Sequence, residues 1–209
     1  MVGYYNPSVI LTYVGLIFSV IGIFQSFGGN IKAALICLMI SGICDMFDGS
    51  IARKVKRDKY AKSFGVQIDS LCDLVCFGVA PAVLAYCAGV KELGVIGISI
   101  LCFYVLAGVI RLGYYNVLEE VNKDNNTTSC GFRGVPITTS ALVVPMFKLI
   151  DVMTGLVNSN IMMAIVMLML GFGFIINIPI RKPAKLGKVV LVFIGLVVFL
   201  SLIKYGSKI

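Results

Sequence analysis

The chain has 209 residues, of which 59% are hydrophobic and only 13% are charged, and its mean hydropathy is +0.99. A soluble domain of this size could not hide so much apolar surface, so we expect one integral membrane domain over residues 1–209. The net charge of +8 would suggest nucleic acid as a partner of a soluble protein. Here the basic residues cluster between apolar segments, where they orient helices, and no nucleic-acid partner is expected.

Apolar segments of about 20 residues, the length that crosses a bilayer as a helix, follow one another along the chain. We expect helices over residues 8–27, 31–53, 65–89, 93–121, 135–156, 161–179 and 186–203. The predicted fold class is therefore all-α. We expect a polytopic protein of the cell membrane whose helices contact membrane lipids.

Seven cysteines lie mostly inside these segments, and the chain has no histidine. The odd number and the apolar surroundings indicate small buried hydrophobic residues, not a disulfide framework. A zinc site is not expected.

Basic residues gather in the connections 54–62, 123–133 and 181–188, which fall on one side of the membrane. Cytoplasmic connections carry an excess of lysine and arginine, so this side is predicted to be cytoplasmic. The amino terminus then lies in the cytoplasm.

Two pairs of aspartates stand out in the second and third segments. Asp45 and Asp48 are three residues apart, and Asp69 and Asp73 are four apart, so each pair shares one helix face. Two facing helices could point four carboxylates at one spot near the cytoplasmic side. A carboxylate at membrane depth costs roughly 2.5–3.5 kcal/mol, which favours a bound cation, and oxygen ligands suit magnesium, manganese or calcium. Any one of them alone would more often be a cap or a solvated residue.

Small and basic residues accompany the aspartates. Gly49 lets a ligand approach where a side chain would obstruct it, Ala52 keeps the same face flat, and Arg53 suits a phosphate or an aspartate partner. Gly65 leaves room for the two aspartate helices to pack closely.

With these residues the chain resembles the CDP-alcohol phosphatidyltransferases, whose signature is D-x-x-D-G-x-x-A-R, a spacer, and G-x-x-x-D-x-x-x-D. All eight defining positions are present between residues 45 and 73. The spacer, residues 54–64, is longer than is usual in that family.

The resemblance implies a six-helix core, here followed by a seventh helix over about 186–203, and a homodimer. It implies transfer of a phosphatidyl group from a CDP-linked lipid to an alcohol, with release of CMP. Asp45, Asp48, Asp69 and Asp73 would bind divalent metal, Mg²⁺ or Mn²⁺ in two ions, with Asp73 only loosely coordinated and acting as general base. The CDP-lipid site would be lined by Asp48, Gly49, Ala52 and Arg53.

Three further stretches, residues 77–82, 111–116 and 132–136, are similar to the phosphatidylserine synthase branch of that family. The resemblance implies L-serine as acceptor and CDP-diacylglycerol or CDP-archaeol as donor. Arg111, Asn116 and Arg133 are the candidate acceptor-binding residues. Both arginines could instead reach anionic lipid headgroups or the lipid phosphate.

Pro81 and Pro136 are expected to shape helices, and Thr138, Thr139 and Ser140 to hydrogen-bond between helices. Two alternatives for the function stay open: the same reaction on glycerol phosphate or inositol phosphate, and, in a different class, a metal-ion transporter.

Overall fold

The computed structural model describes residues 7–52, 59–124, 134–155, 157–177 and 185–205, and these form helices joined by short connections. In chain order the helices are α1 (Pro7–Phe27), α2 (Ile31–Ala52), α3 (Lys59–Asp73), η1 (Leu74–Val79), α4 (Ala80–Cys87), η2 (Val90–Leu93), α5 (Gly94–Asp124), η3 (Ile137–Thr139), α6 (Ser140–Thr154), α7 (Ser159–Ile175) and α8 (Lys185–Tyr205). No strand occurs in the described ranges, which confirms the all-α prediction.

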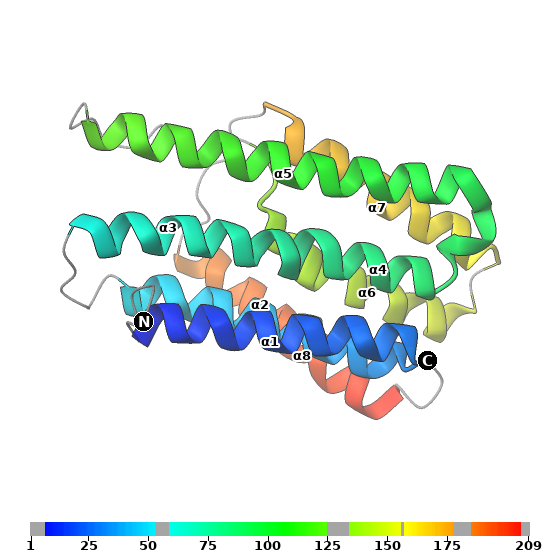
Figure 1. Ribbon diagram of the computed structural model, residues 1–209. Helices are drawn as coiled ribbons and strands as arrows, with labels where there is room; N and C mark the ends of the chain where they lie inside the picture. The colour runs from blue at the N-terminus through cyan, green and yellow to red at the C-terminus, as the bar shows by residue number, and fades with distance from the viewer. Residues whose placement is uncertain (1–6, 53–58, 125–133, 156, 178–184, 206–209) are drawn as a thin grey trace.

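Each of the expected helices is found, although two are built from more than one piece. The third begins at Lys59, six residues earlier than expected, so the last part of the expected basic connection is helical. The third comprises α3, the π-helical η1 and α4, which run on as a single rod (Figure 1). The fifth starts later than expected, with η3 and then α6, because Pro136 is extended, with φ −57° and ψ 143°.

Five of these helical stretches are long and apolar enough to cross a membrane: 9–27, 31–52, 60–87, 90–121 and 137–154. The α7 helix and the described part of α8 are apolar but shorter. Large apolar side chains such as Phe24, Leu106 and Met169 point outward, as on a surface that faces lipid. The protein is a multi-pass membrane protein.

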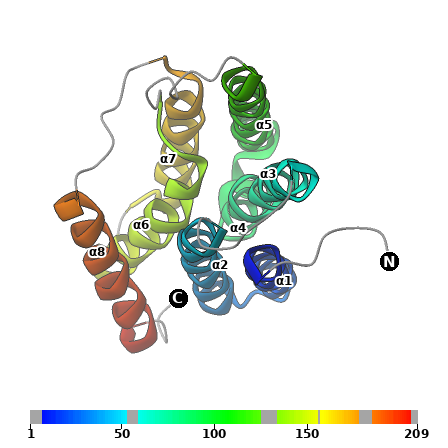
Figure 2. The ribbon, with the colours of Figure 1, turned by 90° about the vertical axis from the view of Figure 1, so that its left-hand side faces the viewer.

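The rods alternate in direction and so have two common ends (Figure 1). At the end that we call the near end, α1 begins, α2 ends, α3 begins and α5 ends; the turn between α1 and α2 lies at the far end. In the end-on view, α6 lies among α2, α7 and α8, with α8 on the outside of the bundle (Figure 2).

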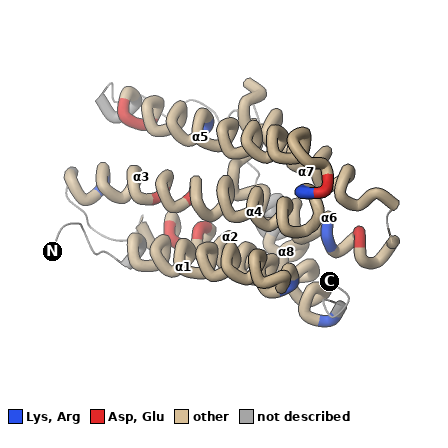
Figure 3. The backbone as a smooth tube through the Cα atoms, turned by 45° about the vertical axis from the view of Figure 1, so that its right-hand side comes forward, with Lys and Arg blue, Asp and Glu red and all other residues tan. Residues whose placement is uncertain are grey.

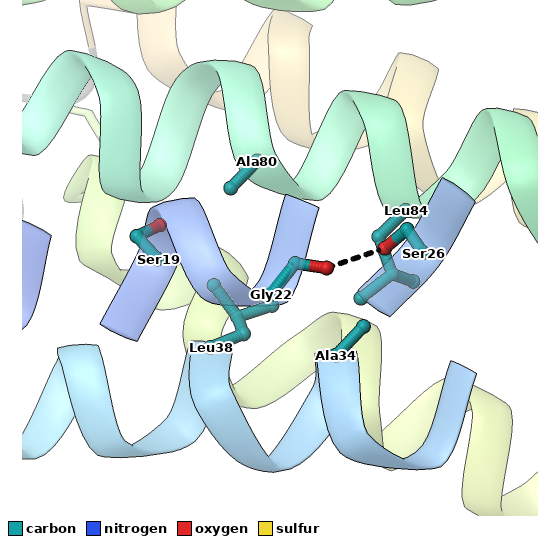
Figure 4. A pocket seen from close by; sticks show the side chains of 7 residues that line it. All are labelled: Ser19, Gly22, Ser26, Ala34, Leu38, Ala80 and Leu84. Atoms are coloured by element: carbon teal, nitrogen blue, oxygen red, sulfur yellow. Dashed lines mark hydrogen bonds between the residues drawn. The ribbon is translucent and has the colours of Figure 1, made fainter. Parts of the chain in front are cut away.

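Small residues let α1 approach α2 closely. A Cβ atom on Gly15 would lie 3.2 Å from Cys44 Cβ, and one on Gly22 would lie 3.1 Å from Cys37 Cβ. Toward the far end, a small cavity remains between α1, α2 and α4 (Figure 4). Its lining is Ser19, Gly22, Ser26, Ala34, Leu38, Ala80 and Leu84.

Candidate functional site

The acidic stretches of α2 and α3 face each other in the near half of the bundle (Figure 3). One carboxylate oxygen each of Asp45, Asp48 and Asp69 lies within 4.8 Å of the other two. We call these three residues the acidic triad. Asp45 precedes the end of α2 by seven residues, or about 10 Å of helix, so the triad lies well inside the bundle.

Asp73 lies beside the triad but is not part of it. It is the last residue of α3, half-buried, and its carboxyl group is at hydrogen-bonding distance from that of Asp45. The expectation that the aspartates gather is therefore met by three converging carboxylates and a fourth that adjoins one of them. Because Asp73 lies outside the triad, its carboxyl group could have a chemical role different from that of the three triad carboxylates.

The α1 helix contributes a residue that sequence reasoning missed. The Thr12 hydroxyl donates a hydrogen bond of 2.7 Å to Asp48 Oδ2, and the Gly49 backbone N–H also donates to the Asp48 carboxylate. Asp48 is the most buried of the three, with 5% exposure. Two donors thus hold the Asp48 side chain in place. A signal existed in the sequence: Thr12, Ser19 and Ser26 recur every seven residues in a largely apolar helix.

A cleft opens between α1, α2 and the rod of α3 and η1, directly behind the aspartates. Besides Asp45, Asp48 and Asp73, its lining consists of Thr12, Gly15, Ser41, Cys44, Cys72, Cys76 and Phe77. The aspartates form the charged side of this cleft, and most of the other lining side chains are small or apolar.

The triad fits a hard divalent cation. Its donors are all carboxylate oxygens, which suit such ions, and three like charges at this distance repel one another unless a cation lies among them. Among the residues that the structure describes, no lysine or arginine forms an ion pair with these carboxylates; Lys148 pairs with Asp151 toward the far end instead. The triad could therefore hold a metal ion.

The small residues of the signature lie near the end of α2, where they leave space for a ligand. Among the described residues, no atom outside its own stretch of α2 lies within 4 Å of a Cβ built on Gly49, so packing within the described part of the chain does not explain the glycine. Ala52 is half-buried at the end of α2. Arg53 falls outside the described residues.

The candidate acceptor residues do not all meet at the triad. Arg111 is only 6% exposed; its guanidinium donates to the Phe174 carbonyl at 3.3 Å and lies 4.7 Å from the Tyr115 ring centre. A cation at the last turn of α7 stabilises that helix end. Reaching out to lipid headgroups, the alternative considered for this residue, is not what the structure shows, because the guanidinium is buried. Arg133 falls outside the described residues.

Asn116 lies at the interface between α5 and α3. It accepts a hydrogen bond of 2.8 Å from the Ser70 hydroxyl and donates one of 3.5 Å to Gln67. Asn116 therefore contacts α3 at the height of Asp69. Of the two described acceptor candidates, Asn116 contacts the helix that carries Asp69 and Asp73, whereas Arg111 contacts α7.

A model of the CDP-alcohol phosphatidyltransferase family matches residues 5–197 of this chain. An archaetidylserine synthase of Methanothermobacter thermautotrophicus is 35% identical over 150 residues, which cover 72% of this chain and 60% of the relative. A CDP-diacylglycerol–serine O-phosphatidyltransferase of Helicobacter pylori is 28% identical over 196 residues, or 93% of this chain and 79% of the relative.

A protein of the same name in Saccharomyces cerevisiae is 40% identical over 127 residues, or 59% of this chain and 44% of the relative. The matched region thus spans less than two thirds of the yeast and Methanothermobacter proteins.

Proposed function

Since this chain belongs to the CDP-alcohol phosphatidyltransferase family, we propose that it transfers the phosphatidyl group of a CDP-linked lipid to the hydroxyl of L-serine. The products would be phosphatidylserine, or its ether-lipid counterpart archaetidylserine, and CMP. The observation that carries the proposal is the convergence of three carboxylates with Asp73 beside them. Serine as the acceptor is supported by the names of the similar proteins.

Asp45, Asp48 and Asp69 are proposed to hold the metal. Two divalent ions held there, Mg²⁺ or Mn²⁺, would neutralise the diphosphate of the CDP-lipid and stabilise CMP as the leaving group. The hydrogen bond from Thr12 would keep Asp48 turned toward this position.

Asp73 is proposed as the general base. A serine hydroxyl is a weak nucleophile at neutral pH, so a carboxylate that accepts its proton is needed. As the proton moves to Asp73, the hydroxyl oxygen forms a bond to the lipid-bearing phosphorus, and the bond from that phosphorus to CMP breaks with its electron pair leaving on CMP. A base must not be tied up as a tight ligand, and the position of Asp73 outside the triad suits this role.

The CDP part of the donor is proposed to lie over the end of α2. Asp48, Gly49, Ala52 and Arg53 would line this site, and the open space beside Gly49 supports a close approach of the nucleotide to the backbone.

For the acceptor, Asn116 and Arg133 are the proposed contacts for the ammonium and carboxylate groups of serine. Arg111 would support this acceptor site indirectly, through its contact with the segment that carries Arg133. A Cβ on Gly134 would lie 3.0 Å from Arg111 Nη1, so the arginine packs closely against the segment that follows Arg133.

The setting proposed for this reaction is the cell membrane, with the near end and the amino terminus on the cytoplasmic side and the chain in a homodimer. The basic residues that follow α2 and α5 in the sequence support that orientation.

The test is CMP release by the purified protein with CDP-diacylglycerol and Mg²⁺ or Mn²⁺. L-serine, glycerol 3-phosphate and inositol 1-phosphate are compared as acceptors. We expect release that depends on L-serine and on the metal. Release with a phosphorylated alcohol in place of serine would overturn the proposed acceptor and leave the donor reaction standing.

A further inference from the structure

The helix that carries Asp73 changes its hydrogen-bond pattern directly after this residue. The six residues of η1, Leu74–Val79, are π-helical, and the Ala80 N–H donates to the Val75 carbonyl, five residues back. A π-helical turn holds one more residue than an α-helical turn, and such turns are frequent at functional sites. The turn therefore shifts the helix face on which every later side chain lies relative to Asp69.

Two carbonyl groups in η1 lack their usual α-helical donors. The Phe77 carbonyl would accept from the N–H of residue 81, which is Pro81 and has none. The Cys76 carbonyl would accept from Ala80, whose N–H donates to Val75 instead. A buried carbonyl without a donor is costly, so other groups must supply the hydrogen bonds.

Hydroxyl groups from three other helices supply them. The Phe77 carbonyl accepts a hydrogen bond of 2.5 Å from the Tyr104 hydroxyl on α5 and one of 3.1 Å from the Ser140 hydroxyl on α6. The Ser140 proton is shared with the Ile137 carbonyl, which lies 2.9 Å from the same hydroxyl. The Cys76 carbonyl accepts a longer bond of 3.5 Å from Ser19 on α1. Tyr104 and Ser140 both have 0% exposure. We call the two short bonds on Phe77 the carbonyl clamp.

We propose that Tyr104 and Ser140 are positioning residues for Asp73: the carbonyl clamp holds η1 in its π-helical form and so keeps the Asp73 carboxyl beside Asp45 and outside the acidic triad. The inference rests on the proposed function, in which Asp73 is the base. The triad itself does not depend on the clamp, because its members lie on α2 and on the part of α3 that precedes η1.

Loss of the clamp should therefore affect turnover and spare metal binding. Without the two hydroxyls, η1 has no side-chain donor on the Phe77 carbonyl, and the turn that starts at Asp73 becomes less well defined. A base displaced by about 1 Å can cost roughly 100-fold in rate.

The test compares the Tyr104→Phe/Ser140→Ala double variant with Ser26→Ala. The control also loses a buried hydroxyl that bonds a carbonyl, that of Gly22 at 2.9 Å, but it lies in α1 away from η1 (Figure 4). Three quantities are measured: kcat and KM with CDP-diacylglycerol and L-serine, Mn²⁺ affinity by electron paramagnetic resonance, and hydrogen exchange of the peptide over residues 74–80.

For the double variant we expect kcat about 10- to 100-fold lower than for the control, with KM for the CDP-lipid and Mn²⁺ affinity within about twofold. Exchange over residues 74–80 should be faster than in wild type and in the control. The proposed role of the clamp would be contradicted by an unchanged kcat or by unchanged hydrogen exchange over residues 74–80. A fall in Mn²⁺ affinity as large as the fall in kcat would also contradict it.

Failure of the proposed function looks different. It would be seen as absence of serine-dependent CMP release in the wild-type protein, or as full turnover in Asp73→Asn. In either case the exchange and Mn²⁺ measurements still decide whether Tyr104 and Ser140 hold η1 in place, and unchanged exchange would overturn that part as well.

Discussion

Asp73 and Asp45 are neighbours with different surroundings, and substitution should separate their roles. Asparagine at position 73 keeps the size of the side chain but cannot accept the proton of the acceptor. We expect Asp73→Asn to lower kcat by about 10²- to 10⁴-fold while Mn²⁺ affinity stays close to that of wild type. Rates of CMP release and Mn²⁺ titration of the same preparation check this.

Asp45→Asn is the matched comparison for that variant. It removes one carboxylate of the triad, so Mn²⁺ and CDP-lipid binding should weaken together with turnover. Equal behaviour of the two variants in the Mn²⁺ titration would contradict the division between triad and base.

Thr12 is a second position at which a single group can be removed. In Thr12→Val the branched shape is retained, but the 2.7 Å hydrogen bond to Asp48 is lost. Partners that orient a metal ligand are typically worth about 10- to 100-fold in metal affinity, so a fall of this size is expected in the Mn²⁺ titration. Thr12→Ser keeps the hydroxyl and should stay near wild type; an equal loss in both variants would show that the hydroxyl is not the cause.

At the scale of residues, the sequence pattern predicted the aspartates well and their partners poorly. Spacings of three and four residues place Asp45 with Asp48 and Asp69 with Asp73 on common helix faces, whatever the packing. Which hydroxyl meets Asp48 depends on how α1 is rotated against α2, and local sequence does not encode that rotation. Arg111 illustrates the same limit, because its carbonyl partner lies 63 residues away on α7.

At the scale of helices, the contact between α2 and α6 is tight at Gly42, three residues before Asp45. A Cβ on Gly42 would lie 2.9 Å from Ala141 Cβ, which belongs to a buried side chain with no freedom to move aside. Gly42→Ala should therefore push the two helices apart at a cost of about 1–3 kcal/mol, seen as a lower Tm in detergent.

The control for this variant is Gly195→Ala in α8, where an added Cβ meets no atom within 4 Å. Its Tm should match or exceed that of wild type, since alanine is the better helix former. A Tm of Gly42→Ala equal to that of the control would mean that the helices adjust without cost.

The helices themselves were predictable because each needs a long apolar run to satisfy its backbone inside a bilayer. What such runs do not encode is the hydrogen-bond pattern within a helix. The expected span over residues 65–89 is indeed one rod, yet its π-helical part appears only in the structure. Pro81 was expected to shape a helix. Because Pro81 has no N–H, the Phe77 carbonyl accepts hydrogen bonds from the Tyr104 and Ser140 hydroxyls instead.

At the scale of the whole molecule, the acidic side chains lie toward the two ends of the bundle (Figure 3). The aspartates lie toward the near end. Toward the far end Asp151 accepts hydrogen bonds from Lys148 at 2.7 Å and from Ser159 at 2.6 Å, and Asn160 donates to Glu92. These bonds tie α6 to α7, and α7 to η2, which directly precedes α5.

The division predicts that the far end serves stability alone. Asp151→Asn removes the charge that pairs with Lys148 and should lower the free energy of unfolding by about 1–3 kcal/mol. Mn²⁺ affinity and KM for the CDP-lipid should not change. Thr154→Val removes an exposed hydroxyl-to-carbonyl bond at the same end and is the control, with no expected effect on Tm. Weaker Mn²⁺ binding in Asp151→Asn would show that the two ends are coupled.

The origin of the carbonyl clamp in two later helices gives the growing polypeptide a definite order of completion. A chain that has reached the end of α4 already contains Thr12 and all four aspartates, but neither Tyr104 nor Ser140. During synthesis the proposed metal ligands leave the ribosome first, and the hydroxyls proposed to position Asp73 follow with α5 and α6. A fragment truncated after α4 would therefore contain the proposed metal ligands but lack the two residues proposed to position its base.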